Sequence, residues 1–124
     1  DGVRRVAEGV ASAHGVGVEV NLALGYGVTI NNDGVAEGAL AAAAALVGTA
    51  NTVRLAHPTM GAEDFSYVID RVPGAMLFLG CTPHEQNYLT AATNHSNRVV
   101  HDEAALPVGV ALHAALALQH LTAK

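Results

Sequence analysis

Residues 16–30 carry the most regular pattern of hydrophobic and polar positions in the chain. Every even-numbered position in this stretch is apolar, whereas the odd-numbered positions are small or polar. Strict alternation predicts a strand with one buried and one solvent-exposed face, which is typical of an antiparallel sheet. Gly25 and Gly27, on either side of Tyr26, predict a bulge or bend partway along the strand. The even-numbered side chains are therefore expected to line a buried sheet face.

Helical spacing of apolar residues is found on both sides of this strand. Residues 3–14 place apolar side chains three and four positions apart and predict an amphipathic helix. Residues 35–47 are rich in alanine and apolar almost all round, which predicts a buried helix. The Asn-Asn-Asp-Gly turn at 31–34 is the best candidate for a domain boundary. The chain is therefore divided into residues 1–33 and residues 34–124.

The second of these parts alternates strands and helices. The short apolar runs at 52–56 and 76–79 predict strands, and the second run is continuous, as in a strand covered on both faces. Helices are predicted at 63–71 and, after a long polar loop, at 102–121 with Asp102 as N-cap. The order strand, helix, strand, loop, helix indicates an α/β architecture.

Composition and charge exclude several classes of partner. Hydrophobic residues make up 51% of the chain, enough for a core, but Lys and Arg together number only 6 and the net charge is -5. Such a chain lacks the cations that nucleic-acid binding requires. Glu37 and His113 interrupt the two longest apolar runs, so no membrane span is expected. The single cysteine, Cys81, cannot form an internal disulfide and fits a reducing, cytoplasmic location.

Two loops carry the residues that can do chemistry. Gly61, Ala62 and Glu63 lead from a predicted strand into a predicted helix, where α/β proteins bind ligands and where backbone N–H groups can hold a carboxylate. The alternative is that Glu63 and Asp64 only interact favourably with the helix dipole. His95 lies in a polar loop before the last helix and can offer a neutral imidazole to a metal ion, or can simply be a solvated side chain.

Taken together, these segments resemble a known family. The sequence Met-Gly-Ala-Glu-Asp-Phe-Ser at 60–66, the apolar strand within 74–80, the His95-Ser96 pair and Asp-Glu-Ala-Ala-Leu-Pro-Val-Gly at 102–109 occur in one order at suitable intervals. They closely resemble the amidohydrolase branch of metallopeptidase family 20, which includes hippurate hydrolases and N-acyl-amino-acid amidohydrolases. The resemblance extends over the whole chain.

The resemblance implies both an architecture and an assembly. Residues 1–33 look like the last helix and strand of an α+β lid or dimerisation domain. Residues 34–124 look like the carboxy-terminal part of a di-metal exopeptidase-like catalytic domain. A homo-oligomer formed through the lid domain is implied, and the chain is expected to be the carboxy-terminal portion of a longer enzyme.

The resemblance also implies a chemistry. Two divalent metal ions, zinc, manganese or cobalt, activate water and polarise the carbonyl of an N-acyl amino acid, so no protein nucleophile is required. His95 occupies the place of the last metal ligand, while the other ligands and the general-base Glu are expected upstream of this chain. Cys81 lies in the wrong segment to be a ligand and is interpreted as a packing thiol, and His101 is a weaker second candidate.

The same resemblance bears on the substrate. Gly61, Ala62 and Glu63 correspond to a loop that lies near the bound acyl-amino acid in related enzymes. The chain departs from the family pattern at Asn97, where many relatives have Pro, and this difference bears on substrate preference more than on metal binding.

Two hypotheses for the chain follow. One histidine cannot hold a metal ion well, so this chain alone is expected to be inactive. The alternative is a non-catalytic α/β interaction or dimerisation module that keeps the fold without the metal site. Metal-ligand motifs in the polypeptide before Asp1 would favour the enzyme, and their absence would favour the module.

Overall fold

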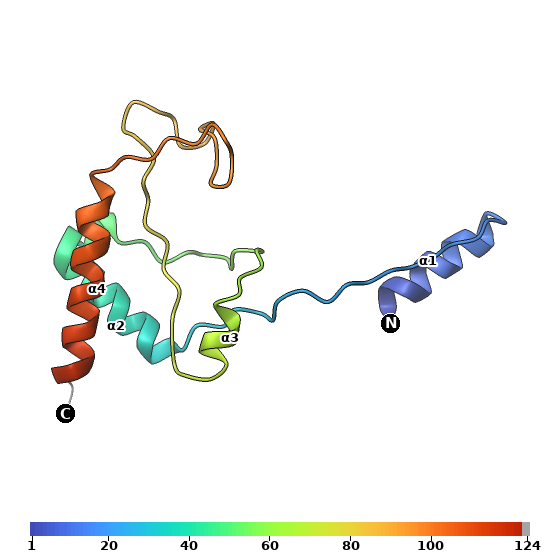
Figure 1. The fold of residues 1–124 in the computed structure, drawn as a ribbon, viewed down its shortest axis with the longest axis horizontal. Coiled ribbons are helices and arrows are strands. Elements are labelled where there is room, and N and C mark those ends of the chain that lie inside the picture. The colour runs from blue at the N-terminus through green and yellow to red at the C-terminus, as the bar shows by residue number, and fades with distance from the viewer. Residues whose placement is uncertain (123–124) are drawn as a thin grey trace.

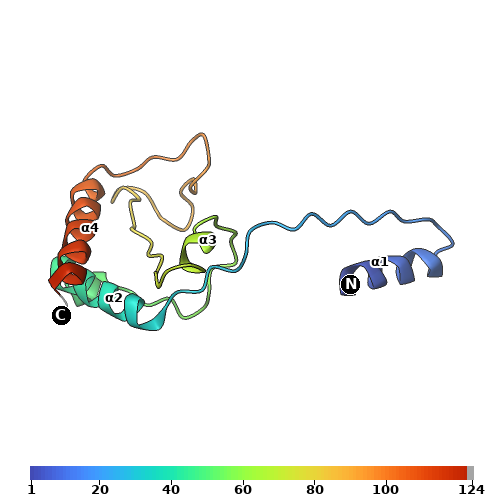
Figure 2. The same cartoon turned by 60° about the horizontal axis from the view of Figure 1, so that its bottom comes forward.

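The computed structural model describes residues 1–122, which form helices joined by long irregular segments. No β-strand is present among these residues. Helices α2 and α4 pack against each other, and a long extended segment separates α1 from them (Figures 1 and 2). The elements in chain order are α1 (Gly2–Ala13), α2 (Asp33–Val47), the short 3-10 helix η1 (Thr49–Asn51), α3 (Ser66–Ile69) and α4 (Ala105–Thr122).

The three long helices confirm the periodicity of the sequence. Helices α1, α2 and α4 begin and end within three residues of the predicted bounds. Their burial is lower than expected, because Ala11 and Ala39 are the only buried hydrophobic residues among those described. The helices therefore form where the sequence predicts them, but their apolar faces remain largely open.

The start of α4 differs from the prediction in one detail. Asp102 is not its N-cap, because the helix begins three residues later, at Ala105. The Asp102 carboxylate instead accepts a hydrogen bond from the Ala104 amide at 2.9 Å, in the turn before the helix. Pro107 is the third residue of α4, where a backbone N–H has no partner within the helix. The proline therefore marks the start of the helix.

Helix α2 has a well-formed amino-terminal cap. The Asn32 side chain accepts a hydrogen bond from the Val35 amide at 3.1 Å, and Asn32 itself has an extended backbone. We expect Asn32→Ala to lower the free energy of unfolding by about 1 kcal/mol, because it leaves a helix N–H without its acceptor. Asn32→Asp keeps the acceptor and should have little effect. Urea unfolding of the two variants in the full-length protein tests this, and equal losses would contradict the capping role.

None of the three predicted strands forms a ladder. Residues 16–30 run as a long extended segment (Figure 2), and residues 52–56 and 76–79 are likewise unpaired along their length. A strand requires a neighbouring strand to bond its N–H and C=O groups, and the described residues provide none for these segments. The α/β architecture therefore stays a prediction, and residues 1–122 do not form its sheet.

The even-numbered face of residues 16–30 is open to solvent. Leu22 is 49% exposed, Val28 77% and Leu24 98%. The expectation that this face is buried is wrong for the described chain, because no element lies over most of it (Figures 1 and 2). Alternation predicts which residues share a face, but burial needs a second layer.

The end of this segment does make contacts with α3. The Tyr26 and Tyr67 rings meet edge to face with centroids 5.9 Å apart. A Cβ on Gly27 would lie 3.8 Å from Ser66 Oγ, and Ser66 is completely buried. The Asn31 side chain forms two hydrogen bonds with the backbone of Met76, which accepts from Nδ2 at 3.2 Å and donates to Oδ1 at 2.9 Å. Residues 26–32 are therefore fixed to the second part of the chain.

Glycines allow close approach around α4. A Cβ on Gly109 would lie 3.3 Å from Leu79 Cδ2, which indicates that the 76–79 segment packs directly on this helix. A Cβ on Gly38 of α2 would lie 3.4 Å from Gln119 Nε2 of α4. The absence of side chains at these two positions allows α4 to contact both neighbours.

Helix α4 is long and apolar enough to cross a membrane by length and composition, with a mean hydropathy of 1.3. The expectation that no segment reaches this length is therefore wrong. A core helix of a soluble protein meets the same criterion. Helix α4 contacts α2 and Leu79, and none of its residues is fully buried by the described chain.

Candidate functional site

The loop between the 76–79 segment and α4 carries the predicted metal ligand. Several short turns order its backbone: the Gln86 amide donates to the Pro83 carbonyl, and the Thr90 and Ala91 amides donate to the Asn87 carbonyl. Where the loop returns to α4, the Asp102 amide donates to the Cys81 carbonyl at 2.7 Å. The loop from Cys81 to His101 is therefore closed at its base.

His95 has an unusual backbone conformation. Its φ angle is +71°, and it is the one non-glycine residue with positive φ in the described part of the chain. Few non-glycine residues adopt this left-handed region, which costs of the order of 1 kcal/mol, although histidine enters it more readily than most. The side chain is exposed. A strained residue with a free imidazole is a feature that folding alone does not favour.

The residues after His95 form a compact turn. The Ser96 amide donates to the Thr93 carbonyl at 3.1 Å, and the Val99 amide donates to the Ser96 carbonyl at 3.3 Å. The Ser96 hydroxyl accepts a hydrogen bond from the Arg98 amide at 3.2 Å. These bonds hold the backbone on the carboxyl side of His95 in one conformation.

The residues that the structure describes do not form a metal site by themselves. No group of three or more His, Cys, Asp or Glu side chains converges among residues 1–122. His101, the weaker second candidate, has its Nδ1 3.0 Å from Cys81 Sγ. Sequence reasoning missed this pair because the two residues are 20 positions apart on an irregular loop. The described residues therefore bring no third ligand to either His95 or the Cys81–His101 pair, and they do not form a di-metal centre.

The predicted substrate loop is also exposed. Gly61, Ala62 and Glu63 all lie at the surface, and no hydrogen bond within the described residues connects them to the His95 loop. Helix α3 begins only at Ser66 and has no acidic residue in its first turn. The predicted helix at 63–71 is thus reduced to four residues. The interaction of Glu63 with a helix dipole, and carboxylate binding by a helix N-terminus, therefore have no basis in this conformation.

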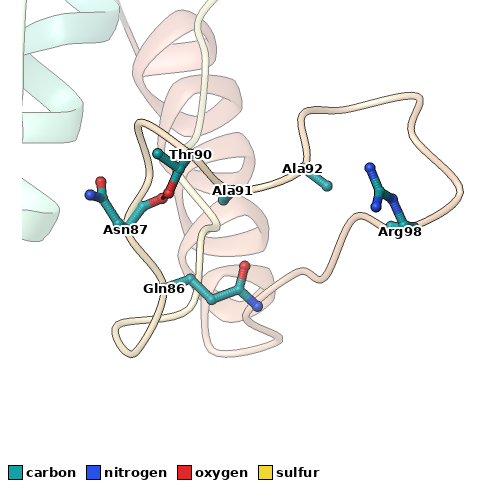
Figure 3. A pocket seen from close by; sticks show the side chains of 6 residues that line it. All are labelled: Gln86, Asn87, Thr90, Ala91, Ala92 and Arg98. Carbon is teal, nitrogen blue, oxygen red and sulfur yellow. Dashed lines mark hydrogen bonds between the residues drawn. The ribbon is translucent and has the colours of Figure 1, made fainter.

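A surface hollow lies within the same loop as His95 (Figure 3). Arg98, three residues after His95, reaches it from one part of the loop, and Gln86 reaches it from another. Neither residue belongs to a motif that the sequence marks as functional. Neither lies in a periodic element, so no pattern in the sequence indicates that they meet. The lining residues are Gln86, Asn87, Thr90, Ala91, Ala92 and Arg98.

Comparison with known proteins identifies the family. Residues 4–119 match the sequence profile of Peptidase family M20/M25/M40, which is nearly the whole chain. The chain belongs to this family. The resemblance stated on the Met-Gly-Ala-Glu-Asp-Phe-Ser and His95-Ser96 motifs is thereby confirmed.

Relatives in the peptidase M20/M25/M40 family include both peptidases and amidohydrolases. The chain is 30% identical over 120 residues to "Thermostable carboxypeptidase 2" of Saccharolobus solfataricus, covering 96% of this chain and 29% of that protein. It is 41% identical over 69 residues to "IAA-amino acid hydrolase ILR1-like 2" of Arabidopsis thaliana, covering 56% and 15%. It is 35% identical over 78 residues to "N-acetyldiaminopimelate deacetylase" of Leuconostoc citreum, covering 63% and 20%. No solved structure matches the chain.

These comparisons bear on the open apolar faces described above. The chain spans less than a third of the length of each of these M20/M25/M40 relatives. The names of the Arabidopsis and Leuconostoc relatives agree with the amidohydrolase branch that the motifs indicate. Each of these relatives therefore contains additional polypeptide that this chain does not match.

Proposed function

We propose that this chain is the carboxy-terminal portion of a metal-dependent enzyme that hydrolyses the amide bond of N-acyl amino acids or similar small amides. Membership in peptidase family M20/M25/M40 supports a hydrolase. Relatives named as an IAA-amino acid hydrolase and as an N-acetyldiaminopimelate deacetylase support an amide bond between an acyl group and an amino acid.

The conformation of His95 is the observation that carries this proposal. The residue combines a left-handed backbone, an exposed imidazole and an ordered turn behind it. Backbone strain of this kind persists where the position of a side chain is needed for function. An imidazole on an ordered turn is pre-positioned to bind a metal ion through a neutral ring nitrogen.

The remainder of the metal centre is proposed to come from polypeptide outside this chain. His95 supplies one ligand, and the other ligands and the general base are expected on upstream segments. The divalent ions, zinc, manganese or cobalt, supply Lewis-acid activation when bound. We further propose that the turn at Gly61, Ala62 and Glu63 faces the substrate and that residues 1–33 belong to a lid domain through which subunits associate.

The chain alone should be inactive. With Mn²⁺, Zn²⁺ or Co²⁺ added, residues 1–124 should show no hydrolysis of hippurate or N-acetyl amino acids, because no three His, Cys, Asp or Glu side chains converge among residues 1–122. Isothermal titration should show only weak metal binding. The control is the full-length protein, which should be active under the same conditions. Turnover by the 124-residue chain that a chelator abolishes would contradict this proposal.

A non-catalytic interaction module remains the second candidate. The observation that favours it is the row of exposed apolar side chains along residues 16–30, such as Leu24 and Ile30, which suits a binding surface. The two candidates differ in the full-length protein, where an enzyme binds metal in a fixed ratio and a module does not. Metal analysis of the purified full-length protein distinguishes them.

A further inference from the structure

The hollow beside His95 contains an unpaired positive charge. The whole chain has a net charge of -5 and only 6 Lys and Arg residues. One ion pair is found in the described part of the chain, and it joins Arg54 to Glu37. Arg98, which lines the hollow, therefore has no carboxylate partner among residues 1–122. A free guanidinium in an acidic protein is suited to an anionic ligand.

The other polar residues of the hollow are neutral. No Asp or Glu lines it, and Gln86 and Asn87 bring side-chain amides. The Asn87 Oδ1 atom accepts a hydrogen bond from the Leu89 amide at 3.0 Å. The Asn87 side chain points away from Arg98 (Figure 3). The Gln86 amide and the Arg98 guanidinium therefore give the hollow hydrogen-bond donors without a neighbouring carboxylate, and these donors suit a carboxylate ligand.

The position of Arg98 is coupled to that of His95. The backbone of Arg98 is bonded to Ser96 Oγ, in the turn that directly follows His95. The half-buried Ala91 and Ala92 lie on the other side of the hollow (Figure 3). A group bound by Arg98 therefore lies in the same loop as the His95 imidazole, and only three positions separate the two residues in the sequence.

We infer that Arg98 binds the α-carboxylate of the N-acyl amino acid, with the amide of Gln86 as an additional donor. This inference rests on the proposed function, since it assigns the substrate of that same site. The guanidinium recognises the amino-acid end of the substrate and thereby orients the amide bond toward the side of the loop that carries His95. Arg98 is thus a specificity residue that selects amino acids with a free carboxylate.

The test compares two substrates in the full-length protein. One is an N-acetyl amino acid, and the other is its carboxamide counterpart, which has no negative charge. Arg98→Met should raise KM for the N-acetyl amino acid by about 10- to 100-fold, because a charge-assisted bidentate contact is lost. It should leave kcat/KM for the carboxamide unchanged. Arg98→Lys, which keeps the charge without the bidentate geometry, should give an intermediate KM.

Arg71→Met is the matched control. It removes one exposed arginine from outside the loop and changes the net charge by the same amount, so KM for both substrates should stay at the wild-type value. Circular dichroism establishes that each variant is folded. Wild-type protein that hydrolyses neither substrate would overturn the proposed function. Active wild type with equal losses on both substrates in Arg98→Met, or with no loss on either, would overturn the role of Arg98 alone.

Discussion

Replacing His95 by alanine in the full-length protein should lower kcat/KM for an N-acyl amino acid by at least about 100-fold, with reduced metal content. A ligand delivers an imidazole nitrogen to about 2.0–2.1 Å from the metal ion, and a water molecule does not reproduce that orientation. The melting temperature should hardly change, because the side chain is exposed. Steady-state kinetics, metal analysis and a melting curve measure the three quantities.

A second substitution, His95→Gly, separates the effect of losing the imidazole ligand from the effect of the backbone conformation at this position. His95→Gly removes the imidazole but accepts a φ of +71° without strain, so its stability should equal or exceed that of the wild type. Its activity should be as low as that of His95→Ala. His84→Ala and His101→Ala remove other histidines of the loop and should keep most of the activity. Near-normal turnover and a full metal complement in His95→Ala would show that the ligand is another residue, with His101 as the next candidate.

Replacing Leu22 by lysine should destabilise the full-length protein by about 2–4 kcal/mol, because an unpaired charge would enter a buried sheet face. In residues 1–124 alone the same change should cost little, since Leu22 is half exposed there. The difference between the two losses of unfolding free energy measures how far additional polypeptide buries residues 16–30 in the complete protein. Urea unfolding of both chains provides the free energies.

Glu19→Lys is the companion substitution on the opposite face. It exchanges one exposed charge for another on the odd-numbered side and should change stability by less than about 0.5 kcal/mol in either chain. If Leu22→Lys and Glu19→Lys destabilised the full-length protein equally, the alternating register of this segment would be wrong.

The long helices of this protein are predictable from its sequence. The pairing of its extended segments and the covering of its apolar faces are not. The spacing of apolar residues locates α1, α2 and α4 to within three residues, since a long helix makes its hydrogen bonds within itself. The short helix α3 was predicted too long, because two acidic residues resemble a first turn that does not form. Residues 16–30 alternate as a strand does, but a strand takes its hydrogen bonds from a neighbour that no single segment specifies.

The candidate site shows the same division. His95 was identified through its motif and lies on an ordered turn, although nothing in the sequence indicates its positive φ. The contact between Cys81 and His101 and the hollow around Arg98 depend on how an irregular loop folds back on itself. Such contacts have no periodicity, so they are found only in three dimensions.

The two hydrogen bonds between Asn31 and Met76 limit how a sheet can grow. The Asn31 amide occupies both the N–H and the C=O of Met76, as the backbone of an antiparallel neighbour would. Just before it, the Asn32 amide donates to the Gly74 carbonyl. An incoming strand on this side is thus excluded at residues 74–76 and must begin beyond them, where residues 77–80 make no backbone hydrogen bond within the described chain. The Asn31 side chain thus prevents strand pairing at Met76 and thereby limits the register of any strand that pairs with residues 77–80.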